Sequence, residues 1–465
     1  MVHFKNTFFL ALVFGGVFST CVLAGPLRLI QPGGNDSSIT GSVVFSENDI
    51  DMQKPAFLLG RPQGHISITK EFESVIDQKK GDRLEYLSTS KKNKLEFFYP
   101  FNKSKNFKSA YAFDRFMSDT KFISDAKISG MSMYASGKGS SNAFAQQVGP
   151  LVLGYFVNNS RDRGNGISEE INGRIESLSP DAATLLLLKS KAEGYQIGAR
   201  LGKWGSVSFL KAADDITARL NFVDADDDYE LPGRITGDRR EINLDLNLSP
   251  VWRVSTAYNH AALGNLDAIT YNDTLEIGRW LSSEEYKMRS YYVSKTASPN
   301  HVWRAGFEDY SGNFKLAGTI DIFGTGANFI SGFYLYHANG FLDRRTLKYG
   351  CGWKKGNYKY KMGYAYSWGD AFFHADIGKR QLFTYTSTYD QSDAYDYSQH
   401  QLGLGFEKKI FKKTALQYSL FQTIPNMRKK NVPPTAAPAA GSAEPVIKKT
   451  TRGGTLHVLS VKYLF

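Results

Sequence analysis

The sequence contains little cysteine and, after its first residues, no long apolar run. With two cysteines among 465 residues, a disulfide scaffold and a cage of thiolate metal ligands are both excluded. The longest compact apolar run, Ala182–Leu188, is far shorter than the roughly 20 residues that a transmembrane helix needs. We interpret this run as a short helix. The mature protein therefore either stays soluble or crosses a membrane as a barrel of strands.

The sequence also lacks the common signatures of catalysis and cofactor binding. It contains no GxxxxGK(S/T) phosphate loop, no GxGxxG, no GxSxG and no HExxH motif. Its eight histidines are scattered, and no two of them have ligand spacing on one strand. An acidic run lacks the glycine and the distant glutamate of a calcium loop, so we interpret it as a solvated loop tip. Its weak candidate metal ligands are Asp224, Asp226 and Asp228. We expect no enzyme, no cofactor and no metal site.

Aromatic residues, glycine and positive charge are abundant instead. Phe, Trp and Tyr make up 14% of the chain, which also contains 43 glycines. Ring side chains favour strands and glycine serves turns and bulges, so this composition favours a large sheet over a helical protein. The net charge of +12 is compatible with nucleic acid, an anionic membrane surface or anionic solutes as partners.

The first residues have the layout of a secretory signal peptide. An eleven-residue apolar run, Phe8–Phe18, is followed by the small-residue end Val22–Ala24. We expect residues 1–24 to be the signal peptide, and the alternative is a lipoprotein in which Cys21 is lipidated. Export argues against nucleic acid as a partner, and cleavage of the signal peptide leaves Cys351 as the single cysteine.

Period-two alternation runs along most of the chain from about residue 192. In Glu241–Ser249, isoleucine and leucine alternate with polar residues; in Tyr358–Ser367, tyrosine and methionine alternate with small or basic ones. Successive side chains of a strand point to opposite faces, so each segment has an apolar face and a polar face. Turn signals such as Ser249-Pro250 and Lys355-Gly356-Asn357 separate these segments, which is typical of an antiparallel meander of hairpins.

The composition of the polar face distinguishes a membrane barrel from a soluble sheet. Soluble sandwiches and small barrels fill their interiors with bulky apolar residues. Here the second face carries glycine, serine, asparagine, lysine and arginine, which is typical of an apolar exterior around a wet interior. The alternative is an exported soluble sheet whose polar face meets solvent.

The C-terminus favours the membrane barrel. Counting back in steps of two gives only apolar residues, with Ser460 and Lys462 between them: Phe465, Tyr463, Val461 and Leu459. This segment resembles the closing strand of bacterial outer-membrane β-barrel (porin-like) proteins, which ends in Phe. The resemblance covers the last seven or so residues. It implies location in the bacterial outer membrane, recognition by the barrel-assembly machinery, and contact with outer-membrane lipid and lipopolysaccharide.

We predict an all-β fold, an antiparallel transmembrane β-barrel of about 16–18 strands within residues 61–465. Residues 25–190 are less regular than the rest, and residues 25–60 form either a periplasmic leader or a plug segment. The stretch 425–454 is rich in Pro, Ala and Lys and cannot bury enough apolar surface to fold alone. We expect it to be a long disordered loop that faces outward.

Strand parity assigns several basic side chains to the lumen. If the apolar faces meet lipid, the inward candidates for selectivity are Arg200, Arg219, Arg253, Lys348, Lys359, Lys361 and Lys462. We expect a passive, porin-like channel that prefers small anionic solutes. The competing interpretation of the charges is a set of mixed networks without net preference. Two alternative functions are an export barrel for an anionic polysaccharide and a closed structural or adhesive barrel; assembly into a homo-oligomer is left open.

Overall fold

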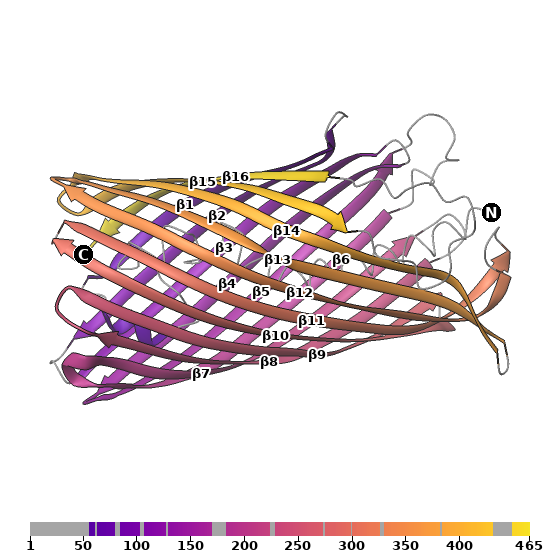
Figure 1. Ribbon diagram of the computed structural model, residues 1–465, viewed down its shortest axis with the longest axis horizontal. Helices are drawn as coiled ribbons and strands as arrows, with labels where there is room; N and C mark the ends of the chain where they lie inside the picture. Colours follow the sequence, from indigo (N-terminus) through magenta and orange to yellow (C-terminus); the bar gives the residue numbers. More distant parts are fainter. Residues whose placement is uncertain are drawn as a thin grey trace.

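In the computed structural model the protein is a closed barrel of antiparallel strands (Figure 1). The structure describes residues 55–60, 63–79, 84–102, 107–126, 129–169, 183–223, 228–272, 275–298, 300–325, 330–381, 384–430 and 449–465. The predicted signal peptide, with Cys21, lies outside the described residues. Within the described ranges, no helix is long and apolar enough to cross a membrane.

Each strand pairs with its neighbours in the sequence, and the first strand pairs with the last to close the cylinder. The strands are β1 (His65–Lys79), β2 (Leu84–Asn102), β3 (Phe107–Ala126), β4 (Ser129–Val148), β5 (Leu151–Glu169), β6 (Ala183–Arg200), β7 (Gly205–Val223), β8 (Asp228–Asn247), β9 (Trp252–Asn272), β10 (Leu275–Ser298), β11 (His301–Thr325), β12 (Ile330–Lys355), β13 (Tyr358–Gln381), β14 (Thr384–Phe411), β15 (Thr414–Lys430) and β16 (Lys449–Leu464). Two 3₁₀ turns accompany them, η1 (Pro55–Gly60) and η2 (Gly202–Trp204). Sixteen strands in the described part of the chain confirm the predicted all-β barrel.

The two ends of the barrel differ in their connections. At the end where β16 finishes, turns of two to four residues join neighbouring strands. Gly149 and Gly356 lie in two of these turns with φ near +60°, a conformation that glycine adopts without strain. At the opposite end, β15 stops at Lys430 and β16 begins at Lys449. Outer-membrane barrels have short periplasmic turns and longer extracellular loops, so the end that carries the C-terminus is the periplasmic end.

The outer surface is apolar over the part of the wall nearest the periplasmic end. On β6, for example, Tyr195 and Ile197 are 45% and 46% exposed, while Gln196 between them is buried. A row of directly opposed aromatic residues crosses five neighbouring strands, and its members are Tyr99, Tyr111, Phe144, Tyr155 and Tyr195. Large apolar side chains exposed around a closed barrel are the surface that meets lipid in an outer-membrane protein.

The last strand closes the barrel as the sequence predicts. Its four apolar residues are exposed on the outer face, and they are Leu459, Val461, Tyr463 and Phe465. The backbone N–H of Phe465 donates to the carbonyl of Gly64 over 3.0 Å. The Phe465 ring stacks on the rings of Phe97 and Tyr99 of β2, with centroids 6.1 and 6.0 Å apart. The C-terminal residue therefore ties β16 to β2 across the end of β1.

Two local expectations are wrong. The run 182–188 is not a helix, since Ala183 begins β6 and the neighbouring strands β5 and β7 supply its backbone partners. The predicted loop 425–454 is too long, because Pro425–Lys430 continue β15 and 449–454 begin β16. In both places, pairing with neighbouring strands overrides the local composition. Residues 431–448 lie outside the described part of the chain.

Candidate functional site: the barrel lumen

The inward faces of the strands carry the polar and charged side chains. On β12, Leu347 and Tyr349 are exposed on the outside, whereas Arg344, Thr346 and Lys348 are buried on the inside. The same alternation on other strands buries polar residues that include Ser67, Glu96, Asp114, Gln196, Asn243, Glu284, Ser367 and Gln401. A closed barrel with a polar inner wall makes the lumen the candidate functional site.

Three of the predicted lumen cations face inward but lie against carboxylates. Arg253 Nη2 is 3.1 Å from Asp245 Oδ1, and Lys348 Nζ is 2.6 Å from Glu308 Oε1. Lys359 Nζ is 3.0 Å from Glu407 Oε1. Each acid comes from the strand next to that of the cation. These pairs match the mixed charge networks of the competing interpretation.

The remaining four predicted cations divide between the two faces. Arg200, Lys361 and Lys462 have lumen parity, and Lys462 is only 4% exposed. Arg219 does not. On β7, Leu210 is buried inside and Phe209 is exposed outside, and unbroken alternation puts Arg219 on the face of Phe209. The prediction for Arg219 is wrong because it took the apolar face as the lipid face, which does not hold towards the extracellular end of this strand.

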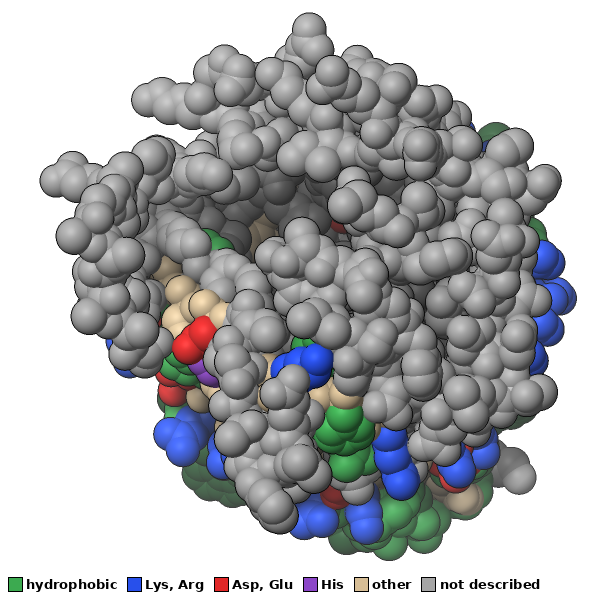
Figure 2. Space-filling model, turned by 90° about the vertical axis from the view of Figure 1, so that its right-hand side faces the viewer, with side chains coloured by type: hydrophobic (Ala, Val, Ile, Leu, Met, Phe, Trp, Pro, Cys, Tyr) green, Lys and Arg blue, Asp and Glu red, His purple; other side chains and the backbone are tan. Residues whose placement is uncertain are grey.

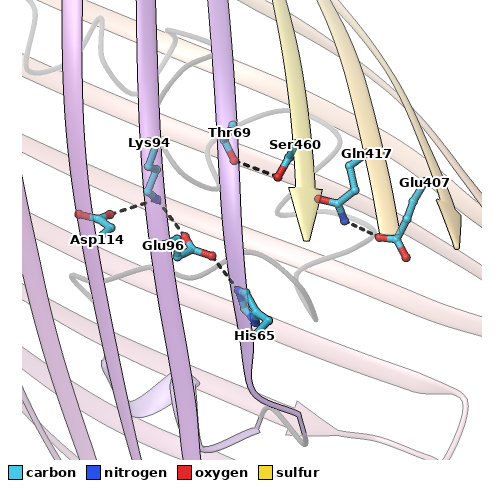
Figure 3. A network of polar contacts seen from close by, with 8 residues as sticks. All are labelled: His65, Thr69, Lys94, Glu96, Asp114, Glu407, Gln417 and Ser460. Atoms are coloured by element: carbon cyan, nitrogen blue, oxygen red, sulfur yellow. Dashed lines mark hydrogen bonds and ion pairs between the residues drawn. The ribbon is translucent and has the colours of Figure 1, made fainter. Parts of the chain in front are cut away.

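A buried ionic network crosses β1, β2 and β3 (Figure 3). Lys94 Nζ lies 3.0 Å from Glu96 Oε2 and 3.0 Å from Asp114 Oδ2. Glu96 in turn is 2.9 Å from His65 Nε2. All four residues are less than one-tenth exposed. Charges removed from water in this way are retained only when they are paired, so the network neutralises this part of the wall.

A second network lies on β10, β11 and β12. Glu308 accepts hydrogen bonds from Lys348 and from the hydroxyl of Tyr292. The guanidinium of Arg344 lies 5.2 Å from the ring centre of Tyr310, and Tyr310 stacks on Tyr286. This arrangement combines ion pairs with aromatic packing on the wall.

The 3₁₀ turn η1 packs inside the barrel. Leu58 and Leu59 are 0% and 4% exposed. They form one apolar cluster with inward residues of five strands, namely Phe98, Ala110, Ala112, Ala143, Ala145, Val152, Phe156, Leu210 and Ala212. Val152 is the second residue of β5, which places η1 close to the periplasmic turns.

The wall beneath η1 is built from small residues that leave room for it. A Cβ on Gly154 would lie 2.6 Å from Pro55 Cγ, closer than side chains approach each other. The amide of Ala56 donates a hydrogen bond to Gln196 Oε1 over 2.9 Å, and Gln196 Nε2 donates to Ser208 Oγ over 3.0 Å. The backbone of η1 is therefore held by a buried polar residue as well as by apolar contacts.

Sequence reasoning found some of these residues and missed others. The strand-like run Lys94–Tyr99 alternates Lys94, Glu96 and Phe98 with apolar residues, and that alternation could have placed them inward. Their pairing with His65 and Asp114 required the register of three strands. Asp224 and Asp226 lie outside the described residues, and Asp228 is the first residue of β8. In the described ranges, no group of three or more His, Cys, Asp or Glu side chains is arranged to hold a metal ion.

Comparison with known proteins adds distant likenesses. No family model matches the chain, and no curated protein matches it. Among solved structures, it is similar to the Pseudomonas putida toluene transporter TodX, at 10% identity, 88% coverage of this chain and 91% of that one, and a TM-score of 0.41. It is also similar to the Ralstonia pickettii toluene transporter TbuX, at 11% identity, 89% coverage of this chain and 92% of that one, and a TM-score of 0.42. A third similar structure is that of a Pseudomonas aeruginosa FadL homologue, at 10% identity, 88% coverage of this chain and 92% of that one, and a TM-score of 0.37.

These three proteins are too distant to say what this chain carries. The protein's own geometry gives its location, because a closed antiparallel barrel with an apolar exterior and a polar interior is the architecture of bacterial outer-membrane proteins. The protein is an outer-membrane β-barrel.

Proposed function

We propose that the protein is a passive channel of the outer membrane for small polar solutes. The observation that supports this most directly is the inner wall, which carries buried polar side chains from β1 (Ser67) round to β16 (Ser460). Side chains fill the interior of barrels of about eight strands, whereas porins of about 16 to 18 strands enclose a water-filled channel. No enzymatic activity is part of the proposal.

We propose that the channel has only a weak preference for anions. Ion pairs with Asp245, Glu308 and Glu407 neutralise three of the predicted cations. Arg200 makes no ion pair with a described residue and lies at the periplasmic end of β6. A fixed charge in a narrow passage concentrates counter-ions, but screening limits its reach to about 10 Å at 0.1 M salt. A modest anion preference that fades as salt increases therefore follows.

The reversal potential across a planar bilayer under a KCl gradient tests this selectivity. We expect a small anion-selective value at low salt that moves towards zero at high salt. Arg200→Gln should reduce it, whereas Arg219→Gln should leave it unchanged because Arg219 lies on the outer face. A cation-selective wild type, or equal effects of the two substitutions, would contradict the proposed selectivity.

We further propose that the segment 25–60 acts as a plug, and not as a leader that lies outside the barrel. The contacts of Leu58 and Leu59 with the inner wall support this. The same contacts favour the second candidate function, a closed barrel, if the segment blocks the passage fully. Liposome swelling in a neutral sugar tests the segment: a variant that lacks residues 25–60 should swell faster than the wild type, and equal rates would contradict a plug.

A further inference from the structure

Three basic side chains lie in one row across the outer face of β4, β5 and β6. Lys138 is directly opposite Arg161, and Arg161 is directly opposite Lys189. All three are exposed, and they share the parity of the outward-facing aromatic row. Directly opposed residues have Cα atoms about 4.5–5.5 Å apart, so the three cations occupy a row about 10 Å long. We call these three residues the basic row.

Several other outward cations pair with an acid on the same strand, whereas the three residues of the basic row form no such pair. Lys191 lies 2.7 Å from Glu193, and Arg240 lies 3.0 Å from Asp238. Lys138, Arg161 and Lys189 make no ion pair with any residue that the structure describes. Like charges placed directly opposite each other on strands are destabilising. A row of three such charges therefore favours the binding of an anionic group from outside the chain.

The height of the basic row indicates where that group lies. Lys138 is ten residues from Val148 at the periplasmic end of β4, and Arg161 is ten residues from Leu151 on β5. With a rise of about 3.3 Å per residue and a strand tilt of about 40°, ten residues span about 25 Å across the membrane. This equals the height of the apolar band of an outer-membrane barrel, about 25 Å. The row therefore lies level with the headgroups of the outer leaflet.

Other basic side chains lie on the outer surface at the extracellular end. Figure 2 shows Lys and Arg side chains around the outer perimeter at this end, with hydrophobic side chains further along the wall behind them. This is the arrangement expected where a lipid's acyl chains meet the wall below and its headgroup meets the wall above.

We propose that the basic row binds the phosphate groups of an outer-leaflet lipid with a phosphorylated headgroup, lipopolysaccharide. Arginine offers planar donors that match phosphate oxygens, and the two lysines add point charges on either side of it. One headgroup that carries more than one phosphate can contact all three strands at once. Binding removes the repulsion within the row and clamps β4, β5 and β6 together from the outside.

The test compares the thermal unfolding midpoint of the full chain in phosphatidylcholine vesicles with and without phosphorylated lipid A. The wild type should gain stability from lipid A, and the triple variant K138Q/R161Q/K189Q should lose at least half of that gain. The triple variant should also be more stable than the wild type in phosphatidylcholine alone, because the opposed like charges are gone. If the basic row were only a solvated group of charges, the wild type and the triple variant would gain the same stability from lipid A.

A matched control removes three outward cations that have acidic neighbours. The variant R234Q/R240Q/K287Q changes the net charge by the same amount and should retain the full gain from lipid A, because these residues pair with Asp215, Asp238 and Glu285. An equal loss of the gain in both triple variants would overturn the proposal, as would an undiminished gain in K138Q/R161Q/K189Q. Stabilisation by inorganic phosphate equal to that by lipid A would assign the row to free anions instead of a lipid.

Discussion

Charge pairing between neighbouring strands stabilises the lumen wall at the scale of single residues. Lys94 lies between Glu96 and Asp114 with 6% of its side chain exposed. Its two partners would face each other without a cation if it were removed. The sequence predicts the inward parity of such residues, because parity depends only on alternation. It does not predict their partners, because these depend on the register between strands.

Replacing Lys94 with Met should destabilise the barrel strongly. Breaking a buried ion pair by removing one partner costs about 3–5 kcal/mol, since the other charge stays buried. The matched control is Lys191→Met, which removes a lysine side chain that is 54% exposed and should therefore cost much less stability. Urea unfolding in lipid vesicles measures both free energies of unfolding. Equal losses for the two variants would show that the network around Lys94 does not stabilise the wall.

Arginine at Val461 should impair assembly, whereas alanine at the same position should be tolerated. Val461 is 46% exposed on the lipid face of the closing strand. A charge there costs roughly 2–4 kcal/mol near the bilayer midplane and less near an interface. The fraction of heat-modifiable, folded protein in isolated outer membranes reports the effect. If Val461→Arg assembled as well as Val461→Ala, this face of β16 would not meet lipid.

The seam of the barrel gives a further test at the same scale. A Cβ on Gly64 would lie 2.6 Å from the Phe465 ring, so Gly64→Val should displace that ring from Phe97 and Tyr99. We expect a lower unfolding midpoint than for Gly356→Val, which strains an exposed turn where φ is +59° but touches no neighbouring atom within 4 Å. A smaller effect at Gly64 than at Gly356 would argue against a role for Phe465 in the seam.

At the scale of elements, η1 is the feature that the sequence left undecided. Composition allows residues 25–60 to be either a leader or a plug, because a short apolar segment packs equally well against several surfaces. The choice depends on a set of small residues distributed over separate strands, among them Ala112, Ala145 and Gly154. Strand periodicity was sufficient to predict the barrel. It does not indicate which part of the inner wall a segment from elsewhere in the chain packs against.

A bulky residue at Gly154 should displace η1 and raise conductance. Gly154→Leu places atoms where Pro55 lies. The matched control is Gly363→Leu, which adds the same volume to the inner face of β13, away from the strands that contact η1. Single-channel recordings should show larger steps for Gly154→Leu and unchanged or smaller steps for Gly363→Leu. Smaller steps for both variants would mean that the added volume only narrows the lumen.

At the scale of the whole molecule, the barrel has a defined orientation. Lys430 and Lys449 lie at the end opposite the C-terminus, and Gly356 lies in a turn at the same end as the C-terminus. An epitope inserted between Ala439 and Ala440 should be labelled by antibody on intact cells. The same epitope after Gly356 should be labelled only once the outer membrane is opened. The reverse pattern would invert the topology.

The conductance of the purified protein tests the central claim, that the lumen is a passage which the N-terminal segment narrows. In a planar bilayer, the wild type should give discrete conductance steps, and the variant that lacks residues 25–60 should give larger ones. Silence of the wild type with steps from the deletion variant would assign the protein to the closed barrel. Absence of steps from both proteins, with folding confirmed by heat modifiability, would contradict the account.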